Sequence, residues 1–205
     1  MFVKVCGMRE AENIRAVEQT GVDWMGFICY EHSSRFVDAC PEYMPSHCRR
    51  VGVFVNATES YIYDKVKELH LHYVQLHGHE SPETCLRLQQ AGLHVIKAFS
   101  ICHAKEFYQT QVYTVSCDYF LFDTPCTTFG GSGTSFDWQI LQAYNGQTPF
   151  LLSGGISPDS LGALTKFSHP KWAGIDLNSR FETAPGIKDA ESLRTFINQF
   201  KNLPL

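Results

Sequence analysis

Short apolar runs alternate with amphipathic stretches along the whole chain, and this pattern predicts a strand followed by a helix, eight times over. Several runs contain almost no polar position, which is typical of strands buried on both faces of a parallel sheet. We expect these strands at residues 2–6, 23–29, 51–55, 73–76, 93–99, 119–122, 149–152 and 173–177.

The stretches between these runs have apolar residues at helical spacing, and several begin at a residue that caps helices well. Thr58 and Ser81 are good N-caps, and Pro82 suits a first turn because its missing N–H has no helical partner there. Glycines 21 and 92 are placed to end helices. We expect helices at residues 9–20, 41–48, 56–70, 81–92, 103–111, 137–144, 157–167 and 189–200, of which 41–48 and 103–111 have the weakest patterns.

Eight such units of about 25 residues each, with short connections, predict one (β/α)8 TIM barrel domain that covers residues 1–205. A doubly wound open α/β sheet is the alternative, since alternation alone does not close a sheet. The barrel is favoured because eight strand–helix units are predicted and together they span the sequence.

Composition narrows the class of protein. The hydrophobic content of 44% and charged content of 19% are ordinary for a globular domain, and a net charge of −4 disfavours a nucleic-acid partner. No run is long enough to span a membrane, and no basic segment precedes an apolar one at the N-terminus, so we expect a cytoplasmic protein. The eight cysteines form no C-x-x-C pair and are expected to be reduced thiols.

Candidate residues for catalysis and for phosphate binding lie close together in residues 118–138. A predicted strand ends in the carboxylate Asp123, a glycine-rich loop at 130–133 follows, and a helix begins near Asp137. Glycines let backbone N–H groups approach an anion closely, and a helix N-terminus behind them adds donors. This order predicts an acid beside a phosphate cradle, as an enzyme for a small phosphorylated substrate would need.

In (β/α)8 barrels the catalytic groups lie where the strands end, and a phosphate site usually follows strands seven and eight. Here both of those loops contain small hydrogen-bonding residues. The polar residues and glycines expected at this mouth are Cys6, Arg35, His77, Asp123, Gly131 to Gly133, Ser153 to Gly155, and Asp176 to Arg180.

Motifs along the whole chain resemble phosphoribosylanthranilate isomerase, in the same order and spacing. They are V-K-V-C-G-M at 3–8, G-F-I-C-Y and S-S-R-F-V within 26–37, V-G-V-F-V-N at 51–56, V-Q-L-H-G at 74–78, F-D-T and F-G-G-S-G-T-S-F-D-W ending at 138, L-S-G-G-I at 152–156, and A-P-G-I-K-D at 184–189.

The resemblance implies a barrel that catalyses an Amadori rearrangement without cofactor or metal, as the third step from chorismate to tryptophan. It implies that Cys6 is the general base, Asp123 the general acid and Arg35 the ligand of the anthranilate carboxylate. The phosphate would lie against Gly131, Ser132, Gly133, Gly154, Gly155 and Ser179, and we expect Lys4, Asp176 and Asn178 to complete the substrate site.

The Amadori rearrangement requires a general acid and a general base. Opening the furanose ring requires a proton at its oxygen, which a carboxylic acid can supply, and the C2′ proton must then go to a base. An unperturbed thiol is mostly protonated at neutral pH. Lys4 projects from the same strand face as Cys6, so we expect its charge to lower the thiol pKa. The alternative is that Lys4 belongs to a structural ion pair with Asp176.

Two positions depart from the family pattern. The family commonly has Lys after the Gly-Ser-Gly turn, where this chain has Thr134, and Val-Ser-Ser-Gly-Val-Glu after strand eight, where this chain has Leu-Asn-Ser-Arg-Phe-Glu at 177–182. Compared with the family pattern, one basic residue is missing at position 134 and another is present at position 180. We expect Arg180 to replace the lost charge at the phosphate.

Other functions are weaker fits. A metal-dependent epimerase would need clustered ligands, and His70, His72, His77 and His79 do not have the H-E-x-x-H spacing. The related histidine-pathway isomerase typically has aspartate in place of Cys6. A phosphate-binding protein without catalysis would not need Cys6 and Asp123, although either residue alone could be structural. The expected partner is a small phosphorylated substrate, and the protein is expected to be a monomer or homodimer.

Overall fold

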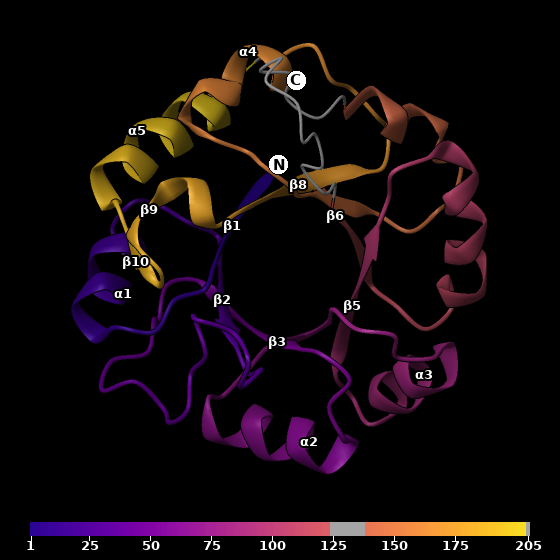
Figure 1. Cartoon of the computed structure of the whole chain (residues 1–205), viewed down its shortest axis with the longest axis horizontal. Coiled ribbons are helices and arrows are strands. Elements are labelled where there is room, and N and C mark those ends of the chain that lie inside the picture. Colours follow the sequence, from indigo (N-terminus) through magenta and orange to yellow (C-terminus); the bar gives the residue numbers. More distant parts are fainter. Residues whose placement is uncertain (124–137, 204–205) are drawn as a thin grey trace.

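In the computed structural model, which describes residues 1–123 and 138–203, eight parallel strands form a closed barrel (Figure 1). The last strand pairs with the first, from Phe2 opposite Gly174 to Val5 opposite Leu177. The predicted barrel is therefore confirmed, and the open sheet is excluded. The strands are β1 (Phe2–Cys6), β2 (Trp24–Ile28), β3 (Arg49–Phe54), β4 (Tyr73–Leu76), β5 (His94–Ser100), β6 (Tyr119–Asp123), β7 (Phe150–Leu152) and β8 (Trp172–Leu177).

Helices surround the barrel, and after β5 they are 3-10 helices or one four-residue α-helix, except for the last helix, which has twelve residues (Figure 1). The α-helices are α1 (Ala11–Glu18), α2 (Glu59–Glu68), α3 (Pro82–Gln90), α4 (Leu161–Leu164) and α5 (Ala190–Lys201). The 3-10 helices are η1 (Ala104–Tyr113), η2 (Trp138–Ala143), η3 (Pro158–Ser160) and η4 (Ser179–Phe181), and a hairpin of β9 (Glu182–Ala184) and β10 (Ile187–Lys188) precedes α5.

Side chains cap the helices where the sequence predicts it. The Thr58 and Ser81 hydroxyls accept hydrogen bonds from backbone N–H groups in the first turns of α2 and α3. The Asp189 carboxylate accepts from two backbone N–H groups of α5, those of Glu191 and Ser192. These contacts satisfy donors that have no partner within the helix.

One expectation is wrong, and one feature was not predicted. No helix forms at residues 41–48; prolines at both 41 and 45 disfavour one, and the segment is instead tied to the Glu18 carboxylate by Ser46 N and His47 N, both at 2.6 Å. The sequence also gave no indication of the β9–β10 hairpin, which is too short for its pattern to be recognised.

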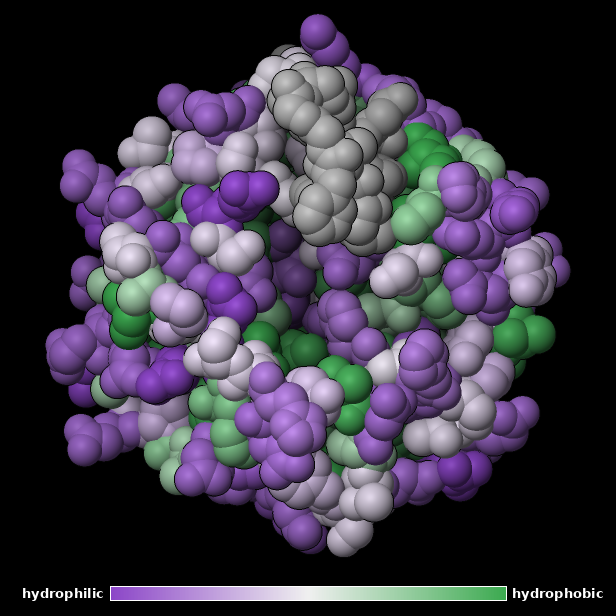
Figure 2. Space-filling model, in the orientation of Figure 1, coloured by the Kyte–Doolittle hydropathy of each residue, from purple (hydrophilic) through white to green (hydrophobic). Residues whose placement is uncertain are grey.

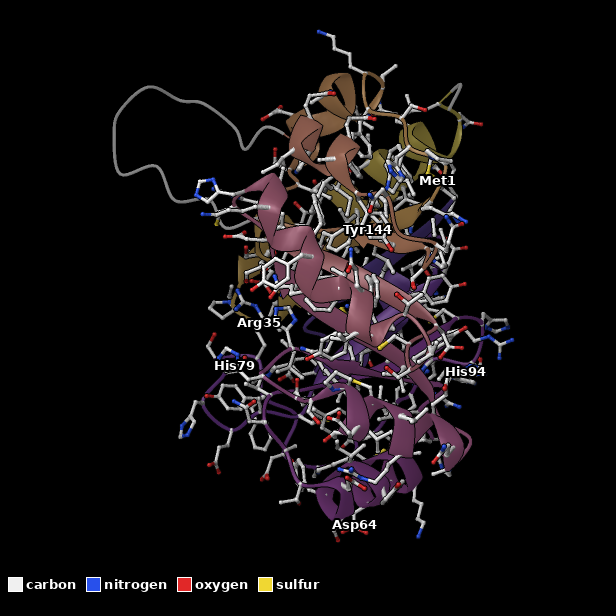
Figure 3. All side chains as sticks on the ribbon, turned by 90° about the vertical axis from the view of Figure 1, so that its right-hand side faces the viewer. Met1, Arg35, Asp64, His79, His94 and Tyr144 are labelled. Carbon is white, nitrogen blue, oxygen red and sulfur yellow. The ribbon has the colours of Figure 1, made fainter. Side chains whose placement is uncertain are left out.

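The two ends of the barrel differ. At the N-terminal end, aromatic rings close the interior: the ring centroids of Phe2 and Trp24 are 4.1 Å apart, and those of Trp24 and Tyr73 are 4.4 Å apart. Figure 2 faces the opposite, C-terminal end, which has a recess near its middle. In the side view, Met1 and His94 mark the closed end, and Arg35 and His79 mark the end with the recess (Figure 3). In the part of the chain that the structure describes, the recess therefore lies at the end where the strands end.

Among the described residues, the model contains no helix with the length and apolar character that a membrane crossing requires.

The cap of α5 can be tested by substitution. We expect Asp189→Ala to lower the free energy of unfolding by about 1 kcal/mol, because two N–H groups lose their acceptor, and Asp189→Asn to lower it by less than half as much. Urea unfolding measures both. Equal losses for the two variants would contradict the capping role.

Candidate active site

A pocket of about 360 Å³ opens at the C-terminal ends of the strands. Seven of the residues that the sequence predicts for the site line it: Cys6, Asp123, Gly154, Gly155, Asp176, Asn178 and Ser179. His77 and Arg180 line it as well. Lys4 and Arg35 lie beside the pocket but do not line it, and Gly131, Ser132, Gly133 and Thr134 lie outside the described residues.

Cys6 ends β1 and is held tightly from the neighbouring strand. It lies opposite Gly26 of β2, and a Cβ atom at Gly26 would be 2.7 Å from the Cys6 Sγ and 3.1 Å from its Cα. Directly after Cys6 the chain turns, and Gly7 N and Met8 N both donate to Gly26 O. Only glycine at position 26 therefore leaves room for the cysteine side chain in this position.

Burial raises the pKa of the Cys6 thiol above its ordinary value. The positive charges of Lys4 and Lys188 act in the opposite direction, and the Asp176 carboxylate adds to the rise. Lys4 thus does favour the thiolate, as expected. The thiol pKa is nevertheless raised overall, because burial is the larger effect.

Lys4 forms a buried ion pair with Asp176. Its Nζ lies 2.9 Å from Asp176 Oδ1, and the lysine side chain is completely inaccessible. Burial is the largest single effect and opposes the charge of Lys4, but the interactions with Asp176 and Cys6 together outweigh it and raise the lysine pKa. Burial raises the pKa of Asp176, and the ion pair opposes that rise. The ion-pair alternative for Lys4 is therefore what the structure contains.

Asp123 ends β6 with about a third of its side chain exposed to the pocket. His77 Nε2 lies 3.7 Å from Asp123 Oδ2, and Gln75 Nε2 lies 2.9 Å from His77 Nδ1. If the Gln75 amide donates this hydrogen bond, the proton of a neutral His77 is on Nε2 and points toward the carboxylate. Among the described residues, His77 is thus the one basic side chain within 4.0 Å of the Asp123 carboxylate.

Arg35 makes a two-pronged contact with Glu182 at the start of β9. Its Nε lies 2.8 Å from Glu182 Oε1, and its Nη2 lies 2.5 Å from Oε2. Lys188 of β10 also donates to Glu182 Oε1, at 2.6 Å, and to Asn178 Oδ1, at 2.7 Å. Burial opposes the charge on Glu182, but the hydrogen bonds from Arg35 and Lys188 outweigh it and lower the glutamate pKa to about 2.

Sequence reasoning gave Glu182 and Lys188 no role. Both lie in segments that were compared with the family, 177–182 and 184–189, so a signal was present. Their proximity to Arg35 depends on the hairpin, which was not predicted.

Small residues and one arginine form the side of the pocket at β7 and β8. Gly154 and Gly155 follow β7 with φ angles of 90° and 66°, a backbone conformation that favours glycine. Ser179 and Arg180 follow β8. In the described part of the chain, the Arg180 side chain has no hydrogen-bond or ion-pair partner, so its donors are available to a ligand.

The described residues contain no group of three or more His, Cys, Asp or Glu side chains that could hold a metal ion. His72 lies at the other end of its strand from His77 and accepts a hydrogen bond from Arg50 N. The histidine-rich segment therefore does not converge on the pocket.

Comparison with known proteins identifies the family. A model of the family "N-(5'-phosphoribosyl)anthranilate (PRA) isomerase" matches residues 3–199. N-(5'-phosphoribosyl)anthranilate isomerase of Phocaeicola vulgatus is 58% identical, and the match covers 98% of each chain. The enzyme of Parabacteroides distasonis is 51% identical, over 97% of this chain and 93% of its own. The chain belongs to the phosphoribosylanthranilate isomerase family.

Solved structures agree with this assignment. Phosphoribosylanthranilate isomerase of Thermotoga maritima superimposes with a TM-score of 0.84 at 30% identity, covering 99% of this chain and 100% of its own. Another isomerase structure, with a TM-score of 0.83 and 29% identity over 99% and 100% of the two chains, contains reduced 1-(o-carboxyphenylamino)-1-deoxyribulose 5-phosphate. The resemblance inferred from the sequence is confirmed, and the protein is an isomerase of the aldose–ketose type.

The contact between Gly26 and Cys6 gives a direct test of the site. We expect Gly26→Ala to lower kcat/KM at least tenfold, because the new methyl group must displace Cys6, and to cost about 1–3 kcal/mol of stability. Turnover is measured well below the melting temperature. Gly162→Ala is the control, since a Cβ at Gly162 meets nothing within 4 Å. Wild-type activity of Gly26→Ala would contradict the tight placement of Cys6.

Proposed function

We propose that this protein converts N-(5-phosphoribosyl)anthranilate into 1-(2-carboxyphenylamino)-1-deoxyribulose 5-phosphate, with Asp123 as general acid and Cys6 as general base. The observation that carries this proposal is that both side chains line one pocket from strands separated by β7 and β8. A substrate that lies across this part of the mouth can contact both groups at once.

In the first step the Asp123 carboxylic acid gives its proton to the furanose ring oxygen. The nitrogen lone pair of the substrate forms a C=N bond to C1′ as the bond from C1′ to the ring oxygen breaks, which produces an open-chain Schiff base. The exposed part of Asp123 faces the pocket, so the carboxyl group can reach a bound sugar. His77, whose Nε2 is 3.7 Å from Asp123, can share a hydrogen bond with the carboxylate left behind.

In the second step the Cys6 thiolate removes the proton from C2′. The electron pair of that bond forms C1′=C2′, and the electrons of the C=N bond return to nitrogen, which neutralises it. The resulting enolamine takes a proton at C1′ and loses the proton of its C2′ hydroxyl, which gives the ketone. The reaction moves hydrogen within one molecule, so no oxidant or reductant is consumed.

The two anionic ends of the substrate have separate sites in this proposal. Gly154, Gly155 and Ser179 are placed to donate to the phosphate, together with Gly131, Ser132 and Gly133 of the glycine-rich loop. Arg35 is placed to bind the anthranilate carboxylate with its Nη1 group, which does not contact Glu182 and has a 3.5 Å hydrogen bond to the Ser34 hydroxyl. Asp176 and Asn178 line the wall between these sites.

The wider role follows from the same proposal. The reaction is the third step from chorismate to tryptophan, it takes a small phosphorylated substrate, and it needs neither a cofactor nor nucleic acid. We infer a cytoplasmic enzyme that is a monomer or a homodimer; a related isomerase from Thermotoga maritima is described as dimeric and has been converted to monomers.

The assignment of acid and base predicts the effect of removing each group. We expect Cys6→Ala and Asp123→Asn each to lower kcat by about a hundredfold to ten-thousandfold, measured as the fluorescence loss of freshly generated phosphoribosylanthranilate. Cys40→Ala and Asp159→Asn are matched controls at exposed positions. If either site variant kept more than a tenth of wild-type kcat, its assigned role would be wrong.

The phosphate assignment predicts a different effect at Arg180. Arg180 is the one lysine or arginine that lines the pocket in the described part of the chain, so it supplies the phosphate with charge. We expect Arg180→Ala to raise KM about tenfold with little change in kcat, and Arg180→Lys to restore much of the binding. Arg194→Ala, on the exposed face of α5, is the control. An unchanged KM for Arg180→Ala would place the phosphate elsewhere.

A further inference from the structure

Two cations share one carboxylate beside the pocket. Glu182 accepts hydrogen bonds from Arg35 on one side and from Lys188 on the other, and we call these three side chains the Glu182 cluster. The Lys188 side chain is completely buried, Glu182 is 5% exposed and Arg35 is 21% exposed. None of the three lines the pocket, but the cluster contacts its wall, because Lys188 donates to Asn178, which lines it.

The cluster is packed against the backbone that follows Cys6. Gly7 has a φ angle of 81°, and a Cβ atom built there would be 2.7 Å from Arg35 Cδ and 3.4 Å from Lys188 Nζ. The same Cβ would be 2.9 Å from Asn178 Oδ1, the second acceptor of Lys188. The Lys188 ammonium is therefore close to Gly7, the residue next to the proposed base.

The position of Lys188 is fixed by more than its ion pair. Its backbone N–H donates to Asn13 Oδ1, and its carbonyl accepts from Asn13 Nδ2, both at 2.8 Å. Gly186 N donates to Glu182 Oε1 at 3.0 Å, which holds the hairpin against the carboxylate. The backbone hydrogen bonds and the ion pair together hold the Lys188 ammonium group, and so its positive charge, in one position.

The charges around Cys6 do not cancel. The charged groups that act on the thiol are Lys4 and Asp176, which pair with each other, and Lys188 and Arg35, which share the single carboxylate of Glu182. Burial lowers the pKa of Lys188, and the Glu182 carboxylate opposes that lowering. With Lys188 protonated, the Glu182 cluster has one positive charge in excess, in a place with little access to water. A buried excess charge favours a nearby anion, and the Cys6 thiolate can supply it.

We propose that Lys188 is a positioning residue that, held in place by Glu182, keeps a positive charge beside Cys6 and so supports the thiolate that acts as the base. The Glu182 carboxylate also holds Arg35, which is proposed to bind the substrate. One carboxylate therefore positions both Arg35 and the positive charge beside Cys6. This inference rests on the proposed role of Cys6. A purely structural Lys188 would hold the hairpin but would not affect the protonation of the thiol.

The test measures Cys6 itself, without substrate. The rate of alkylation of Cys6 by iodoacetamide is followed from about pH 6 to about pH 10 by mass spectrometry of the Cys6 peptide, since only the thiolate reacts. We expect Lys188→Met to move the rate curve about one unit to higher pH, which makes alkylation about tenfold slower at a given lower pH. Lys188→Arg should stay close to wild type. Lys65→Met, which removes a paired lysine from the outer helix α2, is the control and should leave the curve unmoved.

A second variant predicts the opposite shift. Glu182→Gln removes the negative charge of the cluster and should move the curve to lower pH. If Lys188→Met lowers the melting temperature but neither variant moves the alkylation curve, Lys188 is only structural and the proposal is overturned.

Turnover distinguishes this outcome from a failure of the proposed function. The rise of kcat/KM with pH should move with the alkylation curve in each variant. If the pH dependence of alkylation shifts and that of kcat/KM does not, Lys188 supports the thiolate as proposed, but Cys6 is not the base.

Discussion

The parallel pairing of β1 with β8 is the contact on which the rest of the structure depends. It closes the barrel, and it brings Lys4 within 2.9 Å of Asp176, from which it is separated by 172 residues of sequence. It also places the end of β1, with Cys6, next to the segment that follows β8. Without this pairing, neither the buried ion pair nor the pocket wall would exist.

The mouth of the barrel presents two reactive groups in different surroundings. Cys6 is almost completely buried, between Gly26 on one side and the charges of Lys4 and Lys188 on the other. Asp123 is about a third exposed and has a histidine beside it. Burial makes a thiolate costly unless cations compensate it, and the structure brings two buried lysines close to this thiol. The electrostatics of the site therefore come largely from residues that the substrate need not touch.

The sequence was sufficient to predict the barrel and to place Cys6 and Asp123 at its mouth. The strands were predictable because their apolar runs are short and separated by turn residues, and the caps Thr58 and Ser81 are local signals. Glu182 and Lys188 could not be assigned from the sequence, since their roles depend on which residues a short hairpin brings together. The net rise of the Cys6 pKa was also missed, because the extent of burial is a property of the folded molecule.

The most direct test of the account is a crystal structure of this protein with a reduced product analogue of the kind bound in a related isomerase. With Cys6 as the base and Asp123 as the acid, we expect C2′ within about 3–4 Å of Cys6 Sγ and the former ring oxygen within hydrogen-bonding distance of Asp123. We also expect the phosphate against Gly154, Gly155 and Arg180. A ligand bound in the reverse direction, with its phosphate at Arg35 and its sugar away from Cys6, would contradict the account.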